Sequence, residues 1–176
     1  MKKAVIYQIF TRVCCNSRGH NVPRGDIRSN GSGKMNSFTP VVLENIKAMG
    51  VTHIWFTGLI AHASVTDYSS FGIPASHAET VKGIAGAPYA IRDYYDIDPD
   101  LAESVPDRMA EFQSLVERVH ACGLKFILDF VPNHVAREYR SVSKPQGVKD
   151  LGESDDTTVQ SPIPNISRSE ERFSRN

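Results

Sequence analysis

Two segments of this sequence repeat one pattern, in which a helical stretch ends at a glycine and a strand begins directly after it. The pattern is Ala-Met-Gly-Val-Thr-His-Ile-Trp-Phe in residues 48–56 and Ala-Cys-Gly-Leu-Lys-Phe-Ile-Leu-Asp-Phe in residues 121–130. Where helices connect successive strands of one sheet, the crossovers are right-handed and the strands are parallel. The repeat therefore predicts an α/β fold built on a parallel sheet.

The remaining elements fit around this repeat. Strands are predicted over residues 4–10, 51–57 and from 125, and Thr39 before Pro40 is typical of a helix start. Ser104 and Asp107 resemble a capping box for the second helix. Helical spacing predicts that both helices bury an apolar face, made by Val42, Leu43, Ile46 and Met49 in the first and Met109, Phe112, Leu115, Val116 and Val119 in the second.

The lengths of the connections indicate where function lies. Both strand-to-helix connections, 11–38 and 58–104, are far longer than the usual stretch of about 2–6 residues, and the second shows little helical period. The extra chain therefore emerges at the carboxyl ends of the strands, which is the catalytic face of a β/α barrel. With 176 residues the chain is too short for a complete eightfold barrel, which needs roughly 250.

Polar residues follow the last predicted strand. The apolar run from Lys125 predicts a strand buried on both faces, and Asp129 interrupts it at a cost unless its carboxylate is paired. Pro132 ends the pairing, so Asn133 and His134 lie just beyond the carboxyl end, where parallel folds bind ligands. Two plainer interpretations remain open: Asp129 pairs with a structural arginine, and His134 is an ordinary loop histidine.

Aromatic and acidic residues alternate in residues 88–99, Pro-Tyr-Ala-Ile-Arg-Asp-Tyr-Tyr-Asp-Ile-Asp-Pro. An aromatic ring stacks on the apolar face of a sugar while carboxylates accept hydroxyl protons, so this mixture suits sugar binding. A packed turn explains the same residues equally well.

Three segments together resemble the α-amylase family of glycoside hydrolases. D-x-V-x-N-H at 129–134 resembles its first signature region, Y-x-x-x-D-Y-Y-x-I-D-P from Tyr89 its segment after the second strand, and I-Y-Q-I-F-T-R its first strand. Ala90 stands where the family usually has aspartate. The resemblance reaches about Asp156 and implies the first three strands of a parallel (β/α)8 TIM barrel, truncated.

The resemblance also implies the domain boundaries and the substrate. Residues 1–134 would be barrel and 135–159 the start of a loop domain inserted after the third strand. Residues 160–176 show no resemblance and are expected to be an unstructured, non-native tail from a truncation or frameshift. The implied substrates are α-glucans or maltooligosaccharides.

Individual roles follow from the resemblance as well. His134 would hydrogen-bond the sugar at the cleavage point, Tyr89 would stack on that sugar, and Asp129 would support the site by binding an arginine on the fourth strand. Asn133 matches a position that often binds calcium, and Asp93 would be structural. The family's nucleophile and acid/base lie on its fourth and fifth strands, so we expect this chain alone to be inactive.

Composition excludes other classes. Lysine plus arginine and aspartate plus glutamate both number 20, which suggests neither a nucleic-acid nor a membrane partner. Three cysteines form no zinc or disulfide pattern, and without a signal peptide or membrane-length segment we expect a cytoplasmic protein with no organic cofactor. Residues 141–176 are too polar to fold.

The remaining assignments are a core position for Trp55, a loop position for His62, and surface positions for His20, His77 and His120.

Two alternatives to an amylase fragment remain. One is a carbohydrate-binding remnant that keeps Tyr89 and His134 without a nucleophile. The other is an unrelated barrel hydrolase that uses Asp129 and His134 with a metal.

Overall fold

The computed structural model describes residues 3–18 and 21–154, which form two compact units. The first unit contains the chain up to Leu59 and the segment Ile97–Asp129, and the second contains Ile60–Asp96 and the chain from Phe130 onward. The expected tail, residues 160–176, and His20 lie outside the described residues. No helix among the described residues has the length and apolar character needed to cross a membrane.

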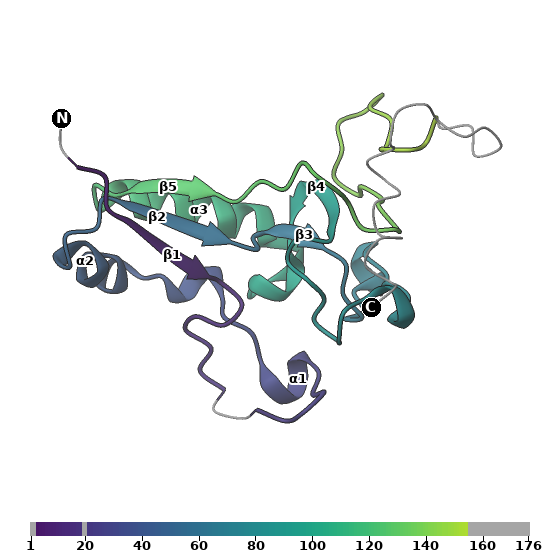
Figure 1. Cartoon of the computed structure of the whole chain (residues 1–176), viewed down its shortest axis with the longest axis horizontal. Coiled ribbons are helices and arrows are strands. Elements are labelled where there is room, and N and C mark those ends of the chain that lie inside the picture. The colour runs from purple at the N-terminus through teal and green to yellow at the C-terminus, as the bar shows by residue number, and fades with distance from the viewer. Residues whose placement is uncertain (1–2, 19–20, 155–176) are drawn as a thin grey trace. The chain divides into compact units, whose positions relative to one another are not determined.

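The first unit is built on a three-stranded parallel sheet (Figure 1). Its strands are β1 (Ile6–Phe10), β2 (His53–Thr57) and β5 (Lys125–Leu128), in the order β1-β2-β5. Ile6 pairs with His53 and His53 with Lys125, so the strands start in register. The parallel sheet predicted from the helix–glycine–strand repeat is therefore confirmed.

Two helices pack on one face of this sheet, α2 (Pro40–Ala48) and α3 (Arg108–Ala121). The side chain of Thr39 accepts a hydrogen bond from the Val42 N–H at 3.4 Å, so the predicted start of α2 is confirmed. The core of the first unit contains Ile9, Leu43, Ile46, Ile54, Phe56, Leu115 and Val119. Its aromatic centre is Phe56, whose ring stacks on that of Phe126 at 4.8 Å and meets that of Phe38 edge-on at 5.1 Å.

The predicted buried faces of the helices are wrong at one end of each. Met49 is 61% exposed because α2 stops at Ala48, and Met49 forms the cap beyond the helix. Met109 is exposed in the first turn of α3, where core packing has not yet begun. Helical spacing alone does not mark the residue at which a face leaves the core.

The predicted capping box at the start of α3 is also wrong. The hydroxyl of Ser104 donates to the carboxylate of Asp107 at 2.6 Å instead of capping a backbone N–H. Glu111, one turn into the helix, accepts the N–H groups of Glu103 and Ser104 at 3.0 and 2.8 Å. These bonds explain why a glutamate is buried on the helix.

β5 is not buried on both faces as its sequence predicted. Phe126 and Ile127 are half-buried, and Leu128 is exposed. β5 has one neighbour, β2, within the described sheet, so the other edge of β5 and part of its surface stay open. The apolar run therefore predicted a strand correctly, but it did not predict that the strand would be only partly buried.

The long connection 11–38 is not free of structure. It contains the short helix α1 (Ile27–Asn30), which Asp26 caps by accepting the Ser29 N–H at 2.8 Å. Further on, Lys34 donates to the carbonyls of Asp100 and Ala102 at 2.7 and 2.8 Å, so the connection is tied to the segment before α3.

The second unit contains a two-stranded sheet of β3 (Ile60–His62) and β4 (Ile91–Ile97). The connection 58–104 therefore contains two strands that its sequence did not reveal. The strand was hidden because arginine and aspartate occupy buried positions on β4, where apolar residues are expected. The other short elements are 3-10 helices: Met35–Ser37, Pro99–Leu101 and Val105–Asp107 in the first unit, and Ser69–Phe71 and Ala78–Thr80 in the second.

Candidate functional site

The carboxyl edge of the parallel sheet carries polar groups in the first unit. Gln8 Nε2 donates to Thr57 Oγ1 at 2.9 Å, and the buried Thr11 donates its N–H and its hydroxyl to the Thr57 carbonyl, both at 3.4 Å. The N–H of Asp129 donates to the Phe56 carbonyl at 3.3 Å, so pairing continues one residue past β5. Asp129 therefore sits at this edge with a half-buried side chain.

In the second unit, Tyr94 on β4 holds the turn that contains His134. Its hydroxyl donates to the Val131 carbonyl and, at 3.4 Å, to the His134 carbonyl. Its ring lies 5.5 Å from that of Phe130 and 5.9 Å from that of Tyr139, measured between centroids. Burial raises the pKa of Tyr94, so its hydroxyl keeps its proton and remains a donor at neutral pH.

His134 is fixed by its neighbour as well as by its backbone. Asn133 Nδ2 lies 3.3 Å from His134 Nδ1. The Asn133 side chain therefore contacts the ring of His134 directly. The imidazole of His134 is half-buried, and imidazole nitrogens can form hydrogen bonds with the hydroxyl groups of a sugar.

Tyr89 lies just before β4 and its side chain is 45% exposed. The backbone next to it is fixed, because the Ala90 N–H donates to the Ala87 carbonyl at 3.0 Å and the Ala63 N–H to the Ala90 carbonyl at 2.9 Å. An exposed ring on a fixed backbone suits stacking. Ala90 itself packs against the small apolar cluster around Val81, so an alanine methyl group fits there.

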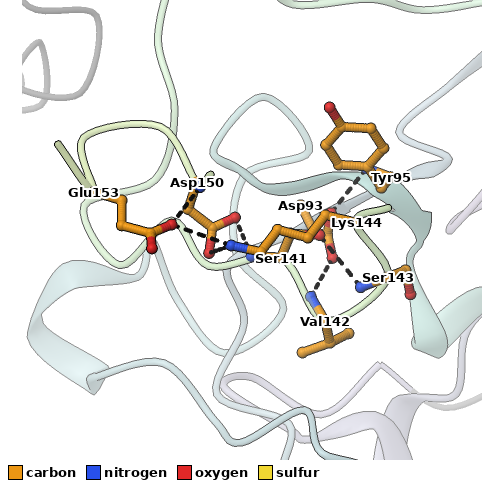
Figure 2. Close-up of polar contacts among 8 residues, drawn as sticks. All are labelled: Asp93, Tyr95, Ser141, Val142, Ser143, Lys144, Asp150 and Glu153. Carbon is orange, nitrogen blue, oxygen red and sulfur yellow. Dashed lines mark hydrogen bonds and ion pairs between the residues drawn. The ribbon is translucent and has the colours of Figure 1, made fainter. Parts of the chain in front are cut away.

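Asp93 connects β4 to the segment 141–153 (Figure 2). It is 2% exposed, and its two carboxylate oxygens accept the N–H groups of Tyr95 and Val142, both at 2.8 Å. The Arg140 N–H donates to the Arg92 carbonyl at 3.1 Å beside it. A buried carboxylate with two N–H donors suits the structural role expected for Asp93.

The segment 141–153 is closed by an ion cluster (Figure 2). Lys144 lies 3.0 Å from Asp150 and 3.2 Å from Glu153, and the Asp150 N–H donates to Glu153 at 2.7 Å. Ser141 is buried and donates its N–H to Asp150 at 3.2 Å. Within residues 141–154 these polar contacts hold the backbone, which forms no helix or strand and whose side chains are mostly exposed.

Asn133 is the residue expected to bind calcium. No group of three or more histidine, cysteine, aspartate or glutamate side chains within residues 3–18 and 21–154 is placed to hold a metal ion. Asn133 is exposed, and its amide nitrogen contacts His134. Its side chain offers one oxygen, whereas calcium takes about 6–8 oxygen ligands.

Three other sequence assignments can be compared with the structure. His62 is wrong as a loop residue, because it lies on β3 and is buried with Nδ1 3.3 Å from the Ile60 carbonyl. Trp55 is half-buried on β2 outside the core cluster, so its core assignment is also wrong. His77 and His120 are exposed, as predicted.

The predicted site residues fall into both units. Asp129 ends the first unit, whereas Tyr89, Asp93, Asn133 and His134 belong to the second. Sequence reasoning missed the specific role of Tyr94. The available signal was one more aromatic residue in a segment already rich in them.

A parallel β-α-β sheet with polar residues at its carboxyl edge is typical of part of a β/α barrel. The family model described as "Alpha amylase, catalytic domain" matches residues 8–165. The chain therefore belongs to the α-amylase family of glycoside hydrolases, and its sheet is the N-terminal part of a TIM barrel. This match contradicts the alternative interpretation of the chain as an unrelated metal-dependent barrel hydrolase.

Similar proteins agree with the family. Maltase A2 of Drosophila melanogaster is 28% identical over 159 residues, which are 88% of this chain and 22% of the maltase. A cyclomaltodextrin glucanotransferase of Bacillus sp. (strain 17-1) is 29% identical over 142 residues, 75% of this chain and 18% of that enzyme. The crystal structure of an alpha-amylase from Lactobacillus plantarum matches with a TM-score of 0.52 and 27% identity, over 77% of this chain and 24% of that one. The chain spans about a fifth of the length of these curated relatives.

Proposed function

We propose that this chain supplies the sugar-binding side chains, but not the catalytic carboxylates, of a retaining α-glycosidase. The substrates would be starch-type α-glucans or maltooligosaccharides. The observation that carries the proposal is the arrangement of His134, whose ring contacts the Asn133 amide and whose backbone carbonyl accepts from the Tyr94 hydroxyl. The names of the maltase and the glucanotransferase relatives support a substrate with α-glucosidic bonds.

His134 and Tyr89 would divide the recognition of one sugar ring. The imidazole of His134 would hydrogen-bond a sugar hydroxyl, and the exposed ring of Tyr89 would stack on an apolar sugar face. Asp129, at the carboxyl edge of the parallel sheet, would act as a positioning residue through an arginine of a further strand.

The reaction itself needs groups that the described chain does not bring together. A retaining glycosidase uses a nucleophile and an acid/base whose carboxyl groups lie about 5–5.5 Å apart. The α-amylase resemblance assigns this pair to the fourth and fifth barrel strands, whereas the described sheet has three. The chain alone would therefore bind without cleaving. Asn133 would supply one ligand to a bound calcium ion.

Binding by the chain alone should be weak. Stacking on a sugar contributes on the order of 1 kcal/mol, and a neutral hydrogen bond about the same. Association costs an estimated 4 kcal/mol or more, so a dissociation constant in the millimolar range or weaker, about −4 kcal/mol at best, is expected.

A titration with maltotriose followed by NMR tests the proposal. Tyr89→Ala and His134→Ala should each weaken the binding of the wild-type chain. Tyr95→Ala is the matched control for the tyrosine, because Tyr95 is 43% exposed on β4, the strand that follows Tyr89, and His77→Ala is the control for the histidine. If the wild type binds and neither Tyr89→Ala nor His134→Ala weakens it, the sugar site lies elsewhere.

A further inference from the structure

Two adjacent cysteines, Cys14 and Cys15, lie in the turn after β1, and the proposed function uses neither of them. Their sulfur atoms are 3.4 Å apart. Cys15 is exposed, and Cys14 is half-buried against the core of the first unit. The third cysteine, Cys122, is buried at the end of α3.

The backbone around this pair is held firmly. The N–H groups of Val13 and Cys14 both donate to the Phe10 carbonyl, at 3.1 and 3.0 Å. On the other side, Gly33 donates to the Arg12 carbonyl at 2.7 Å, and a Cβ on Gly33 would lie only 2.1 Å from the Cys14 carbonyl oxygen. These contacts hold the backbone on both sides of the two cysteines.

Cys15 adopts a left-handed backbone conformation with φ of 61°. Few residues other than glycine take this conformation. The unusual backbone conformation of Cys15 occurs together with the 3.4 Å contact between the sulfurs of Cys14 and Cys15.

We propose that Cys14 and Cys15 form a thiol–disulfide exchange site, which closes to a vicinal disulfide by reaction with small disulfides of the glutathione type. The sulfur of Cys15 attacks one sulfur of the small disulfide, its S–S bond breaks, and one small thiol leaves. The sulfur of Cys14 then attacks the sulfur of Cys15 in the mixed disulfide and releases the second small thiol. Two protein thiols are oxidised, one small disulfide is reduced, and the two protons pass to the released thiols.

Accessibility sets the order of these steps. The exposed Cys15 meets the small disulfide first, since exchange depends on access to the attacking sulfur. Burial raises the pKa of Cys14 to about 11, so Cys14 keeps its proton until the mixed disulfide is adjacent to it. Closure then shortens a contact of 3.4 Å to a bond of about 2 Å.

The closed form should be easy to reduce again. Adjacent Cα atoms are about 3.8 Å apart, which is less than the roughly 4.4–6.8 Å that disulfides usually span. A bond between neighbours is therefore strained, and strained, exposed disulfides are the labile ones. The site fits reversible exchange rather than permanent cross-linking.

Peptide mapping of the full chain tests this proposal directly. The chain is equilibrated with oxidised and reduced glutathione at graded ratios, quenched with acid, and alkylated with N-ethylmaleimide in denaturant. Trypsin, which cuts after Arg12 and Arg18, releases both cysteines in peptide 13–18, whereas Cys122 falls in peptide 119–125. Peptide 13–18 should lose two hydrogens and carry neither maleimide nor glutathione, and peptide 119–125 should carry maleimide. Excess reduced glutathione should restore both maleimides on peptide 13–18.

Three serine variants separate the steps. Cys14→Ser should stop at a glutathione mixed disulfide on Cys15, and Cys15→Ser should leave Cys14 with maleimide. Cys122→Ser should close like the wild type. The proposal is overturned if wild-type peptide 13–18 stays reduced at every ratio, accumulates the mixed disulfide, or joins to a second chain. These wild-type outcomes decide the matter even where a variant folds poorly.

Discussion

Replacing Asp93 with asparagine should release the segment 141–153 from β4. Asp93 is buried, and each of its oxygens accepts one backbone N–H, from Tyr95 and Val142. Asparagine has the same shape but only one acceptor oxygen. Whichever way its amide turns, one of the two N–H groups faces an NH2 group and loses its partner.

The size of the effect follows from the cost of an unsatisfied donor. A buried N–H without a partner costs about 1–3 kcal/mol, and hydrogen bonds to charged groups contribute about 1.5–3 kcal/mol. We therefore expect exchange of the Val142 or Tyr95 amide hydrogen in Asp93→Asn to be about 10–100-fold faster than in the wild type, because local opening controls exchange. Residue-resolved hydrogen exchange by NMR measures both amides.

Asp67→Asn provides the matched control. Asp67 accepts the N–H of Ser69, two residues further along the chain, at 3.0 Å, just as Asp93 accepts that of Tyr95 at 2.8 Å, but Asp67 is exposed. Water replaces the lost bond there, so Asp67→Asn should change exchange at Ser69 by a factor of about two. If exchange at both Val142 and Tyr95 stays within that factor in Asp93→Asn, Asp93 does not hold the segment.

Three further outcomes are expected. Tyr94→Phe removes the hydroxyl bonded to the His134 carbonyl and should weaken maltotriose binding about three- to tenfold in the NMR titration; unchanged affinity would show that Tyr94 does not position His134. Two contacts hold the pKa of Glu153 below the ordinary value of 4.5: the hydrogen bond from the Asp150 N–H, which has the larger effect, and the interaction with Lys144. The stabilisation of segment 141–153 by Glu153 should therefore be complete above pH 4.5 and lost as the pH falls through the lowered pKa. In an NMR pH titration, a change in the chemical shift of the Asp150 amide with its midpoint at or above pH 4.5 would contradict this. The open edges of the sheet and the exposed Ile6 should favour oligomers in light scattering, and a cooperative melt from a pure monomer would be contrary evidence.

The parallel sheet was predictable because its signals are local. Thr39 before Pro40 starts a helix, Gly50 and Gly123 end the two helices, and an apolar run follows each glycine directly. These signals depend on the backbone and on nearest neighbours along the chain. For this reason the order of helix and strand was predicted although no tertiary contact was known.

The second unit was poorly predicted because its order depends on polar contacts between distant residues. β4 contains Arg92, Asp93 and Asp96 at buried positions, so its composition resembles a surface loop. Asp93 is buried because Val142, far along the chain, gives it a donor. A pattern of apolar residues cannot reveal such a strand.

The candidate site was predictable only through resemblance. Tyr89 and His134 have ordinary surroundings in the sequence, and only the α-amylase signature gave them roles. The structure adds the Asn133 contact and the Tyr94 hydroxyl, which fix how His134 is presented. Neither contact follows from spacing along the chain.

The most direct test of this account is an assay for reducing sugar released from maltotriose or starch by the purified chain alone. The account predicts no release above a blank, because the nucleophile and the acid/base are both absent from the three-stranded sheet and their joint loss removes nearly all activity. Release above the blank that His134→Ala abolishes and His77→Ala leaves intact would contradict it, because the chain would then contain a catalytic pair of its own.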